Sequence, residues 1–257
     1  MIKELSLRKK ELMEVFEKNH SRMAAVIVEP LIQGAGGMVV QSLNWLTFLV
    51  ELAKKAEIPV IFDEVFSGMG RVGGGGYFAY QRANLNPDII CIAKGLTGGN
   101  LPLALTLSTE EIFEAFLDDR TDKALLHGHS FTANPIACAA ANATLQIYQS
   151  ENLIQRSSFI EQRMSDWVAQ NQNSGAENIR NIGSILAFEL PGSGTNSYHS
   201  KLKSKAVKIG IENGVLFRPL GNTIYLAPPL TITDQELTVA LTALDRVVQT
   251  FDEEPSN

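Results

Sequence analysis

The sequence predicts an α/β fold, in which a mostly parallel sheet carries helices on both faces and a smaller C-terminal α+β domain follows. Continuous apolar runs at 23–30, 58–65 and 88–95 are typical of strands that are buried on both faces. Helix-like segments alternate with these runs, and the pattern changes near residue 151. We therefore expect one domain over residues 1–150 and a second over residues 151–257.

The remaining elements of the first domain follow from apolar periodicity. Residues 1–19 are charged and amphipathic, and LNWLTFLVELAKKAE (43–57) has a second amphipathic pattern, so both predict helices. PLALTLS (102–108) predicts a fourth strand. NPIACAAANATLQIY (134–148) predicts a helix whose N-cap is Asn134, with a proline at the first helical position.

The second domain begins with a polar helical pattern at 152–170. ENIRNIGSILAFELPG (177–192) then predicts one strand, and residues 200–213 predict a helix. Two short strands are expected around VLFRPLGNTIYLAPP (215–229). The final helix opens at Thr233 with the capping-box pattern T-x-x-E.

Composition and charge argue against several function classes. A formal net charge of −6 argues against a general nucleic-acid binder, which would show a basic patch or stripe. No apolar run approaches the ~20 residues that span a bilayer, so we expect no membrane partner. Cys91 and Cys138 both lie in apolar stretches, which favours buried free thiols over a disulfide. We expect a soluble intracellular protein, cytoplasmic, or mitochondrial if the source is a eukaryote.

Three predicted strands of the first domain end in a charged residue: Glu29, Asp63 and Lys94. Ligands of parallel α/β sheets bind beyond the carboxyl ends of the strands, so we expect these side chains to share a site. A partly desolvated lysine favours the neutral amine, which can attack a carbonyl, and a nearby aspartate can hold a protonated heterocyclic nitrogen. Pyridoxal phosphate uses this pairing, and the helix that follows HSFTANP offers backbone N–H groups to its phosphate.

Five segments resemble, in order and spacing, the class III (fold type I) pyridoxal-phosphate aminotransferases. They are VIVEPLIQGAGGM, IFDEVFSGMGRVG, PDIICIAKGLTGGNLPLALTL, HGHSFTANPIACAAANATL and FRPLGNTIYLAPP. KGLTGGNLPLALTLS, HGHSFTANPIACAAANATL and IYLAPPL are most similar to the members of this class that act in biotin synthesis. The resemblance implies the later part of a PLP-binding large domain over 1–150, a small domain over 151–257 and pyridoxal 5′-phosphate as the cofactor.

The resemblance also implies roles for individual residues. Lys94 would bond to the cofactor and carry the proton between the substrate Cα and the cofactor C4′, and Asp63 would keep the pyridine nitrogen protonated. Val65 would pack on one face of the ring, and Ser130 would help to bind the phosphate, in this family usually that of the partner subunit. Arg218 would hold the carboxylate of the keto substrate. Three further residues are candidates for the substrate pocket: Glu29, Arg71 and Tyr225.

The reaction that the resemblance implies is a ping-pong transamination. S-adenosylmethionine would give its amino group to the cofactor, and 8-amino-7-oxononanoate would take it to become 7,8-diaminononanoate. Another class III activity, of the omega-amino acid or ornithine type, is the alternative substrate class.

The resemblance covers only the later part of the family's chain. The family's first strands, its Gly-Ser-rich phosphate loop and its ring-stacking aromatic residue have no counterpart in this sequence. We therefore expect an unpaired sheet edge and exposed apolar faces, and a homodimer or a partner chain that supplies the missing N-terminal portion. A truncated or non-catalytic partner half is the second hypothesis.

Other interpretations of single residues stay open at this point. Arg218 can form a structural salt bridge, and Tyr225 can be an ordinary strand aromatic. His127 and His129 suggest a metal pair, but no Cys, Asp or Glu lies beside them at ligand spacing. GLTGGN is not a nucleotide phosphate loop, because its lysine precedes the glycines and no Gly-Lys-Ser/Thr follows.

Overall fold

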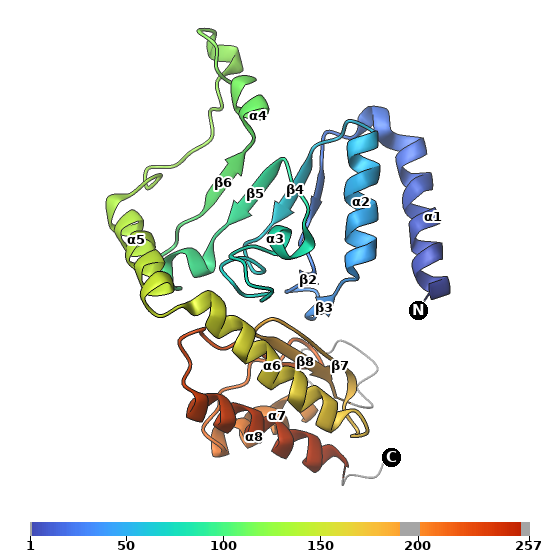
Figure 1. The fold of residues 1–257 in the computed structure, drawn as a ribbon, viewed down its shortest axis with the longest axis vertical. Coiled ribbons are helices and arrows are strands. Elements are labelled where there is room, and N and C mark those ends of the chain that lie inside the picture. The colour runs from blue at the N-terminus through green and yellow to red at the C-terminus, as the bar shows by residue number, and fades with distance from the viewer. Residues whose placement is uncertain (1, 191–200, 253–257) are drawn as a thin grey trace. The chain divides into compact units, whose positions relative to one another are not determined.

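The computed structural model describes residues 2–190 and 201–252, and the side chains of 6–190 and 203–250 (Figure 1). The chain divides into two compact units. The first unit comprises Met1–Leu31, Gln41–Met69 and Phe78–Ser150, and the second comprises Ile32–Val40, Gly70–Tyr77 and Glu151–Asn257. Two short segments from the first half of the sequence therefore group with the C-terminal half.

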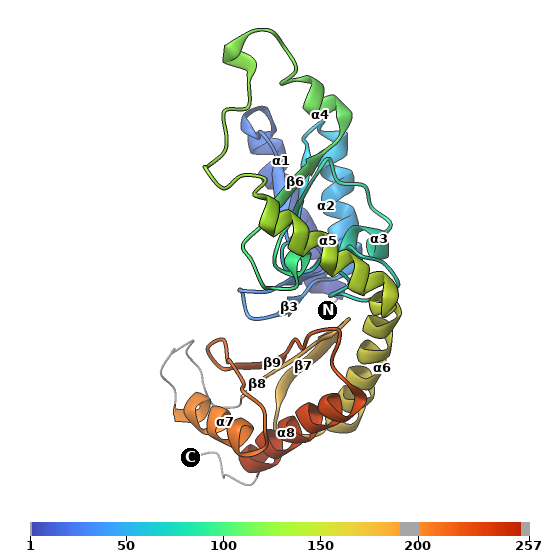
Figure 2. The same cartoon turned by 90° about the vertical axis from the view of Figure 1, so that its left-hand side faces the viewer.

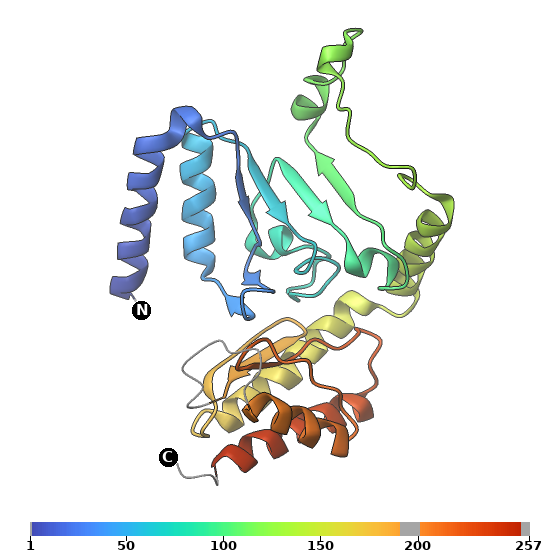
Figure 3. The same cartoon turned by 180° about the vertical axis from the view of Figure 1, so that it is seen from behind.

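A four-stranded mixed sheet forms the centre of the first unit. Its order is β1 (Val26–Val28), β4 (Val60–Asp63), β5 (Ile89–Ile92) and β6 (Leu105–Ser108), seen side by side in Figure 3. The pairs β1–β4 and β4–β5 are parallel, whereas β6 is antiparallel to β5. The predicted α/β class and the mostly parallel sheet are confirmed.

Five α-helices accompany this sheet within the described residues. They are α1 (Ile2–Asn19), α2 (Leu43–Lys55), α3 (Ala79–Ala83), α4 (Glu110–Glu114) and α5 (Pro135–Ser150). Helix α2 packs against β4, and α1 packs against α2. The core here is built from fully buried side chains such as Leu46, Val60 and Phe62. Three short 3-10 turns complete the unit: η1 (His20–Arg22), η2 (Lys94–Thr97) and η3 (Thr121–Lys123).

An exposed apolar surface lies on β6 and on the segment that follows it. β6 is an edge strand, and all four of its residues are exposed. In Figure 1, α4 and the chain after it extend away from the sheet. The large exposed apolar side chains between β6 and the start of α5 are Leu105, Leu107, Phe113, Phe116, Leu117, Leu125, Leu126, Phe131 and Ile136. We call these nine residues the β6–α5 apolar surface, and they match the exposed faces that the sequence predicts.

The second unit is a three-stranded antiparallel sheet with helices on one side, as Figure 2 shows. The strands are β7 (Glu177–Ile182), β8 (Ile185–Glu189) and β9 (Thr223–Leu226), in that order. Helix α6 (Leu153–Asn171) packs against β7 and β8, and α8 (Asp234–Asp252) packs against α6 and α7 (Lys201–Glu212). The rings of Trp167 and Phe188 stack at 5.9 Å in this core.

A small hairpin, β2 (Ile32–Gln33) with β3 (Val39–Val40), also belongs to the second unit. Arg180 of β7 fixes its turn, since Nε donates to the Met38 carbonyl at 2.8 Å and a terminal nitrogen donates to the Gly37 carbonyl at 2.6 Å. The guanidinium also pairs with Glu189 at 3.3 Å. Burial lowers the pKa of Arg180, and the nearby Glu189 carboxylate partly offsets this shift.

Two strand predictions for the second unit are wrong. The segment 177–192 is not one strand but the hairpin β7–β8, because Gly183 takes a left-handed φ of +54° and reverses the chain; residues 191 and 192 lie outside the described part. Around 215–229 a single strand, β9, replaces the expected two, and Leu220 makes only an isolated bridge to Thr223.

Both predicted helix starts are confirmed by hydrogen bonds. Asn134 Oδ1 accepts from the N–H groups of Ile136 and Ala137 at 3.0 and 3.2 Å, which makes it the cap of α5. At α8, Thr233 N–H donates to the Glu236 carboxylate at 2.8 Å and Glu236 N–H donates to Thr233 Oγ1 at 3.2 Å. No helix in the described part of the chain is long and apolar enough to cross a membrane.

Gly183 offers a sharp test of the β7–β8 turn. A Cβ at this position would lie 2.2 Å from the Arg71 carbonyl oxygen and 2.2 Å from the Val72 carbonyl carbon, and backbone atoms cannot rotate away. We expect Gly183→Ala to destabilise the second unit by roughly 2–5 kcal/mol, from left-handed strain and overpacking together. Urea unfolding followed by Trp167 fluorescence, in a Trp45→Phe background, measures this loss.

Gly75→Ala is the matched control. Gly75 also has a left-handed φ, of +78°, but its added Cβ would meet nothing within 4 Å. Only the backbone strain of about 1–2 kcal/mol should appear. Equal losses in the two variants would show that crowding at the turn has no part in the effect.

Candidate functional site

The carboxyl ends of β1, β4 and β5 meet at one edge of the first unit's sheet. Register pairs Val28 with Phe62 and Asp63 with Cys91, so Glu29, which follows Val28, lies level with Asp63. Lys94 follows β5 by two residues and begins η2. The structure thus brings the three predicted charged positions to one sheet edge, where α/β folds bind ligands.

Lys94 presents a free amine at this edge. Its ammonium lies 5.3 Å from the centroid of the Phe66 ring, and no described residue accepts a hydrogen bond from it or pairs with it. The residue has a left-handed φ of +46°, a strained conformation that tends to cluster at functional sites. The side chain is exposed, which differs from the partial desolvation that the sequence predicts. The neighbouring part of the first unit is open to water as well: Gly98, Gly99 and Asn100 are exposed, and so is all of β6.

Packing beneath η2 sets the position of Lys94. A Cβ on Gly95 would lie 2.9 Å from the Met69 Cβ, so the turn and the loop after β4 are in close contact. Tyr148 of α5 donates a hydrogen bond of 2.7 Å to the Met69 carbonyl, and α5 packs against η2. The lysine therefore stands on a turn that is supported by a strand loop and a helix of the same unit.

Asp63 is the last residue of β4, and its carboxylate is half-buried. Oδ1 accepts a hydrogen bond of 3.1 Å from the Val65 N–H, which orients the carboxylate against its own loop. The other carboxylate oxygen has no partner among the described residues. Asp63 can therefore accept one further bond, for example from a protonated ring nitrogen.

Glu64, next to Asp63, is a buried carboxylate that sequence reasoning missed. It is 1% exposed and accepts three hydrogen bonds, from Ser67 Oγ at 2.7 Å, Ala79 N at 3.0 Å and Tyr80 N at 2.9 Å. Burial raises its pKa, and the three bonds partly offset that shift. Glu64 thereby ties the loop after β4 to the start of α3.

A pocket of about 950 Å³ opens beside Lys94 within the first unit. This volume is in the range that small-molecule sites use. Its lining residues are Val65, Ala93, Lys94, Gly99, Asn100, Leu101, Pro102, Leu103, Ala104, His129, Phe131 and Asn134. Lys94 and Val65 were predicted for the site, whereas His129, Phe131 and Asn134 were not assigned to it.

Ser130 lies between two of these lining residues, His129 and Phe131. Its side chain is exposed and has no hydrogen-bond partner among the described residues. Asp63 does not line the pocket itself but precedes the lining residue Val65 by two positions. From the sequence, His129 was a candidate only for a metal pair with His127. The one sequence feature that points to its place in this pocket is that it precedes Ser130.

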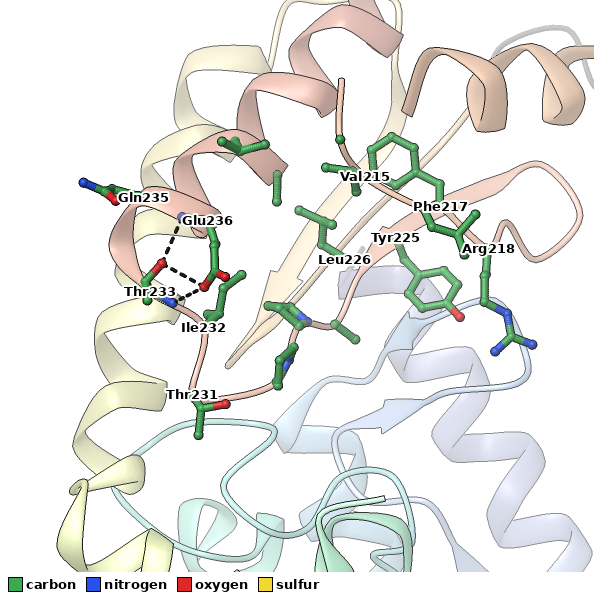
Figure 4. A pocket seen from close by; sticks show the side chains of 17 residues that line it. Val215, Phe217, Arg218, Tyr225, Leu226, Thr231, Ile232, Thr233, Gln235 and Glu236 are labelled. Carbon is green, nitrogen blue, oxygen red and sulfur yellow. Dashed lines mark hydrogen bonds between the residues drawn. The ribbon is translucent and has the colours of Figure 1, made fainter. Parts of the chain in front are cut away.

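Arg218, Tyr225 and Arg71 belong to the second unit. Arg218 and Tyr225 line a pocket of about 900 Å³, shown in Figure 4, between the loop before β9 and the start of α8. The Arg218 guanidinium is exposed, and no described residue pairs with it, so the structural salt bridge that the sequence left open is not formed. Arg71, by contrast, donates to Ser184 Oγ at 3.0 Å and to the Pro228 carbonyl at 2.5 Å.

Comparisons with known proteins agree with this geometry. Residues 3–248 match the family model "Aminotransferase class-III". The chain is 37% identical over 243 residues to the adenosylmethionine-8-amino-7-oxononanoate aminotransferase of Helicobacter pylori, with 92% of this chain and 54% of that protein covered. It is 41% identical over 216 residues to the protein of the same name from Synechococcus elongatus, with 84% and 50% covered.

A solved structure gives the same result. The chain superimposes on adenosylmethionine-8-amino-7-oxononanoate aminotransferase from Methanocaldococcus jannaschii with a TM-score of 0.84 and 32% identity, covering 95% of this chain and 57% of that one. The chain therefore spans about half the length of the relatives that it matches.

Glu64 generates a testable prediction about this edge of the sheet. In Glu64→Gln, an amide NH2 replaces one of the oxygens that accept hydrogen bonds. The groups that donated to this oxygen then face another donor and lose their bond. We expect a loss of about 1–3 kcal/mol in the free energy of unfolding at pH 7. Because burial raises the pKa of folded Glu64 above 4.5, wild type gains stability by binding a proton as the pH falls towards 4.5, and the variant does not.

The cost of Glu64→Gln should therefore grow as the pH is lowered from 7 to 4.5. Urea unfolding at several pH values measures it, with the exposed Glu51→Gln of α2 as the control. A cost that shrinks over this interval would mean that the hydrogen bonds lower the pKa of Glu64 by more than burial raises it.

Proposed function

Because the chain belongs to the class III aminotransferases, we propose that it takes part in pyridoxal-phosphate-dependent transamination from S-adenosylmethionine to 8-amino-7-oxononanoate, which gives 7,8-diaminononanoate. The observation that carries the proposal is the unpaired amine of Lys94, held on a strained turn at the edge where Asp63 ends the neighbouring parallel strand. The names of the matching relatives support the substrate pair.

The residues around Lys94 fit pyridoxal phosphate. When bound, the cofactor supplies an aldehyde for an amine and a ring that accepts electrons. Lys94 would hold the aldehyde carbon and move the proton at the substrate Cα, since its amine has no competing partner within the described chain. Asp63 would accept a hydrogen bond from the ring nitrogen with its free oxygen. Val65 would contact the ring. Ser130 would donate its hydroxyl to a cofactor phosphate, in this family usually that of the partner subunit.

In the second unit, Arg218 suits the carboxylate of the keto substrate. A guanidinium can bind a carboxylate with two parallel hydrogen bonds, and this one is exposed and unpaired among the described residues. The Tyr225 hydroxyl likewise has no partner there, so it can contact the same substrate. Glu29 and Arg71 already interact within the chain, so they fit a role in shaping the pocket better than direct binding.

Association with further polypeptide is the second part of the proposal. The chain spans about half the length of its relatives, and the β6–α5 apolar surface would be costly to leave in water. A homodimer, or a partner chain that supplies the remaining portion, would cover this surface and the β6 edge. In the alternative, the chain is a non-catalytic half that keeps these residues without using them.

A reducing compartment such as the cytoplasm fits the thiols. Cys91 and Cys138 are both free and half-buried. An oxidising compartment would favour disulfides in a chain with accessible thiols. For a eukaryotic source, the mitochondrial matrix meets the same requirement.

Covalent capture of pyridoxal phosphate tests the proposed function. The purified chain should develop a visible absorption band with added cofactor, and borohydride should make the attachment permanent. Peptide mass spectrometry should locate the label on Lys94, and Lys94→Ala should lose both the band and the label. Lys54→Ala, which removes an exposed lysine of α2, should keep them.

Equal labelling of wild type and Lys94→Ala would remove the basis of the proposal. The same spectra identify the donor: S-adenosylmethionine should bleach the band, whereas ornithine and 4-aminobutyrate should leave it. Bleaching by ornithine instead would move the chain to the other class III activity.

The β6–α5 apolar surface gives an association test. Wild type should sediment as a species larger than its 28.1 kDa monomer, or bind the dye ANS strongly when monomeric. Leu126→Glu, at a residue that is 90% exposed, should shift the protein towards monomer and reduce dye binding. Leu7→Glu, at an exposed leucine of α1, is the control. A wild-type monomer that binds no dye would show that this surface needs no partner.

A further inference from the structure

One wall of the Arg218 pocket is an irregular segment, residues 227–232, which follows β9 and leads to α8. We call this segment the 227–232 wall. Figure 4 shows Thr231 and Ile232 of the wall on one side of the pocket and Arg218 on the other. The position of the wall therefore sets how much room a ligand bound at Arg218 has.

The wall cannot hold its place by continuing the sheet. Pro228 and Pro229 have no backbone N–H, so the ladder between β8 and β9 finds no donor at these two positions and ends at Leu226. Within the wall, the Ile232 N–H donates to the Pro229 carbonyl at 3.1 Å, and the Leu230 side chain is buried. The two ends of the wall are held by side chains from elsewhere in the second unit.

Arg71 holds the first end. One of its terminal guanidinium nitrogens donates to the Pro228 carbonyl at 2.5 Å and to Ser184 Oγ at 3.0 Å. The Ser184 N–H donates back to the Arg71 carbonyl at 2.9 Å, which fixes Arg71 itself to the turn between β7 and β8. The wall is thereby tied to the three-stranded sheet through one arginine, although its own backbone has left that sheet.

Arg156 of α6 holds the second end. It donates to the Ile232 carbonyl at 2.5 Å and pairs with the Asp234 carboxylate at 2.5 Å. Its guanidinium carbon also lies 4.8 Å from the centroid of the Phe159 ring, so the head group is fixed on its own helix. Two arginines from distant parts of the sequence thus bond to two carbonyl groups of the same short segment.

We propose that Arg71 and Arg156 are positioning residues of the Arg218 pocket, which hold the 227–232 wall where the substrate chain needs it. The inference rests on the proposed function, because it takes Arg218 to bind the carboxylate of the keto substrate. Neither arginine lines the pocket, so neither would touch the substrate. A wall that is in the binding position for only part of the time lowers the ligand affinity by that fraction.

The probe is heptanedioate, which carries a carboxylate on a chain of methylene groups as the keto substrate does. Calorimetric titration should show about 10- to 100-fold weaker binding to Arg71→Met, the range expected for a hydrogen bond that involves a charged group. Arg71→Lys keeps a charged donor and should recover part of the loss. Ser184→Ala removes the other side-chain partner of Arg71 but leaves the Pro228 bond, so it should bind the probe as wild type does.

Arg156→Met tests the second end of the wall and should weaken binding of the probe to a similar extent. Its control is Asp234→Asn, which removes the ion pair with Arg156 but leaves the bond to the Ile232 carbonyl. Arg218→Gln should abolish binding, because it takes away the partner of the carboxylate.

Hydrogen exchange separates positioning from a general loss of stability. Prolines have no amide hydrogen, so a peptide that covers residues 227–232 reports mainly on Leu230, Thr231 and Ile232. In Arg71→Met this peptide should exchange about 10-fold faster than in wild type, whereas peptides from β8 and from the middle of α8 should keep their rates.

The outcomes separate this inference from the proposed function. Wild-type affinity in Arg71→Met or in Arg156→Met would overturn the role of that arginine, and faster exchange throughout the second unit would overturn positioning in favour of general stability. Equal binding of the probe by wild type and Arg218→Gln would also overturn the inference, since the pocket would not recognise the carboxylate. The Lys94 label is measured on the first unit, so its loss alone would count against the transamination and not against the two arginines.

Discussion

The parallel pairing of β1, β4 and β5 is the constraint on which the rest of the site depends. Each strand is short and mostly apolar, and the register places the residues after Val28, Phe62 and Ile90 at one sheet edge. An acidic side chain on β4 and an amine just past β5 can serve one ligand only because these strands run the same way. An antiparallel neighbour at either place would send one of the two groups to the opposite edge.

The charged side chains discussed above fall into two sets, which differ in whether they have partners within the described chain. Glu64, Arg71 and Arg180 have their hydrogen-bonding capacity occupied by backbone and side-chain partners, so they hold loops in place. Lys94 and Arg218 have no hydrogen-bond or ion-pair partner among the described residues. A charged group that is held in position but unpaired is available to a ligand, whereas a paired one must first break existing bonds.

The sequence predicts the strands of the first unit and the edge where its charges gather, because buried parallel strands appear as continuous apolar runs. The same rule fails for β7 and β8. Ile182 and Ile185 flank the dipeptide Gly183-Ser184, and Gly-Ser is a weak turn signal, so the two strands look like one in the sequence. The role of Glu64 could not be predicted, because the sequence alone does not distinguish a buried, hydrogen-bonded glutamate from an exposed one. The orientation of His129 depends on a backbone bond from Phe131, which no spacing rule encodes.

Lys94 and β6 belong to one continuous exposed region of the first unit. The pocket wall from Gly99 to Ala104 continues directly into β6, whose residues are all exposed. A polypeptide that paired with β6 and covered the β6–α5 apolar surface would therefore also exclude water from the mouth of the Lys94 pocket. Exclusion of water strengthens every electrostatic contact inside a site. The association that would remove the apolar surface from solvent would then be the same event that gives Lys94 the surroundings its chemistry requires.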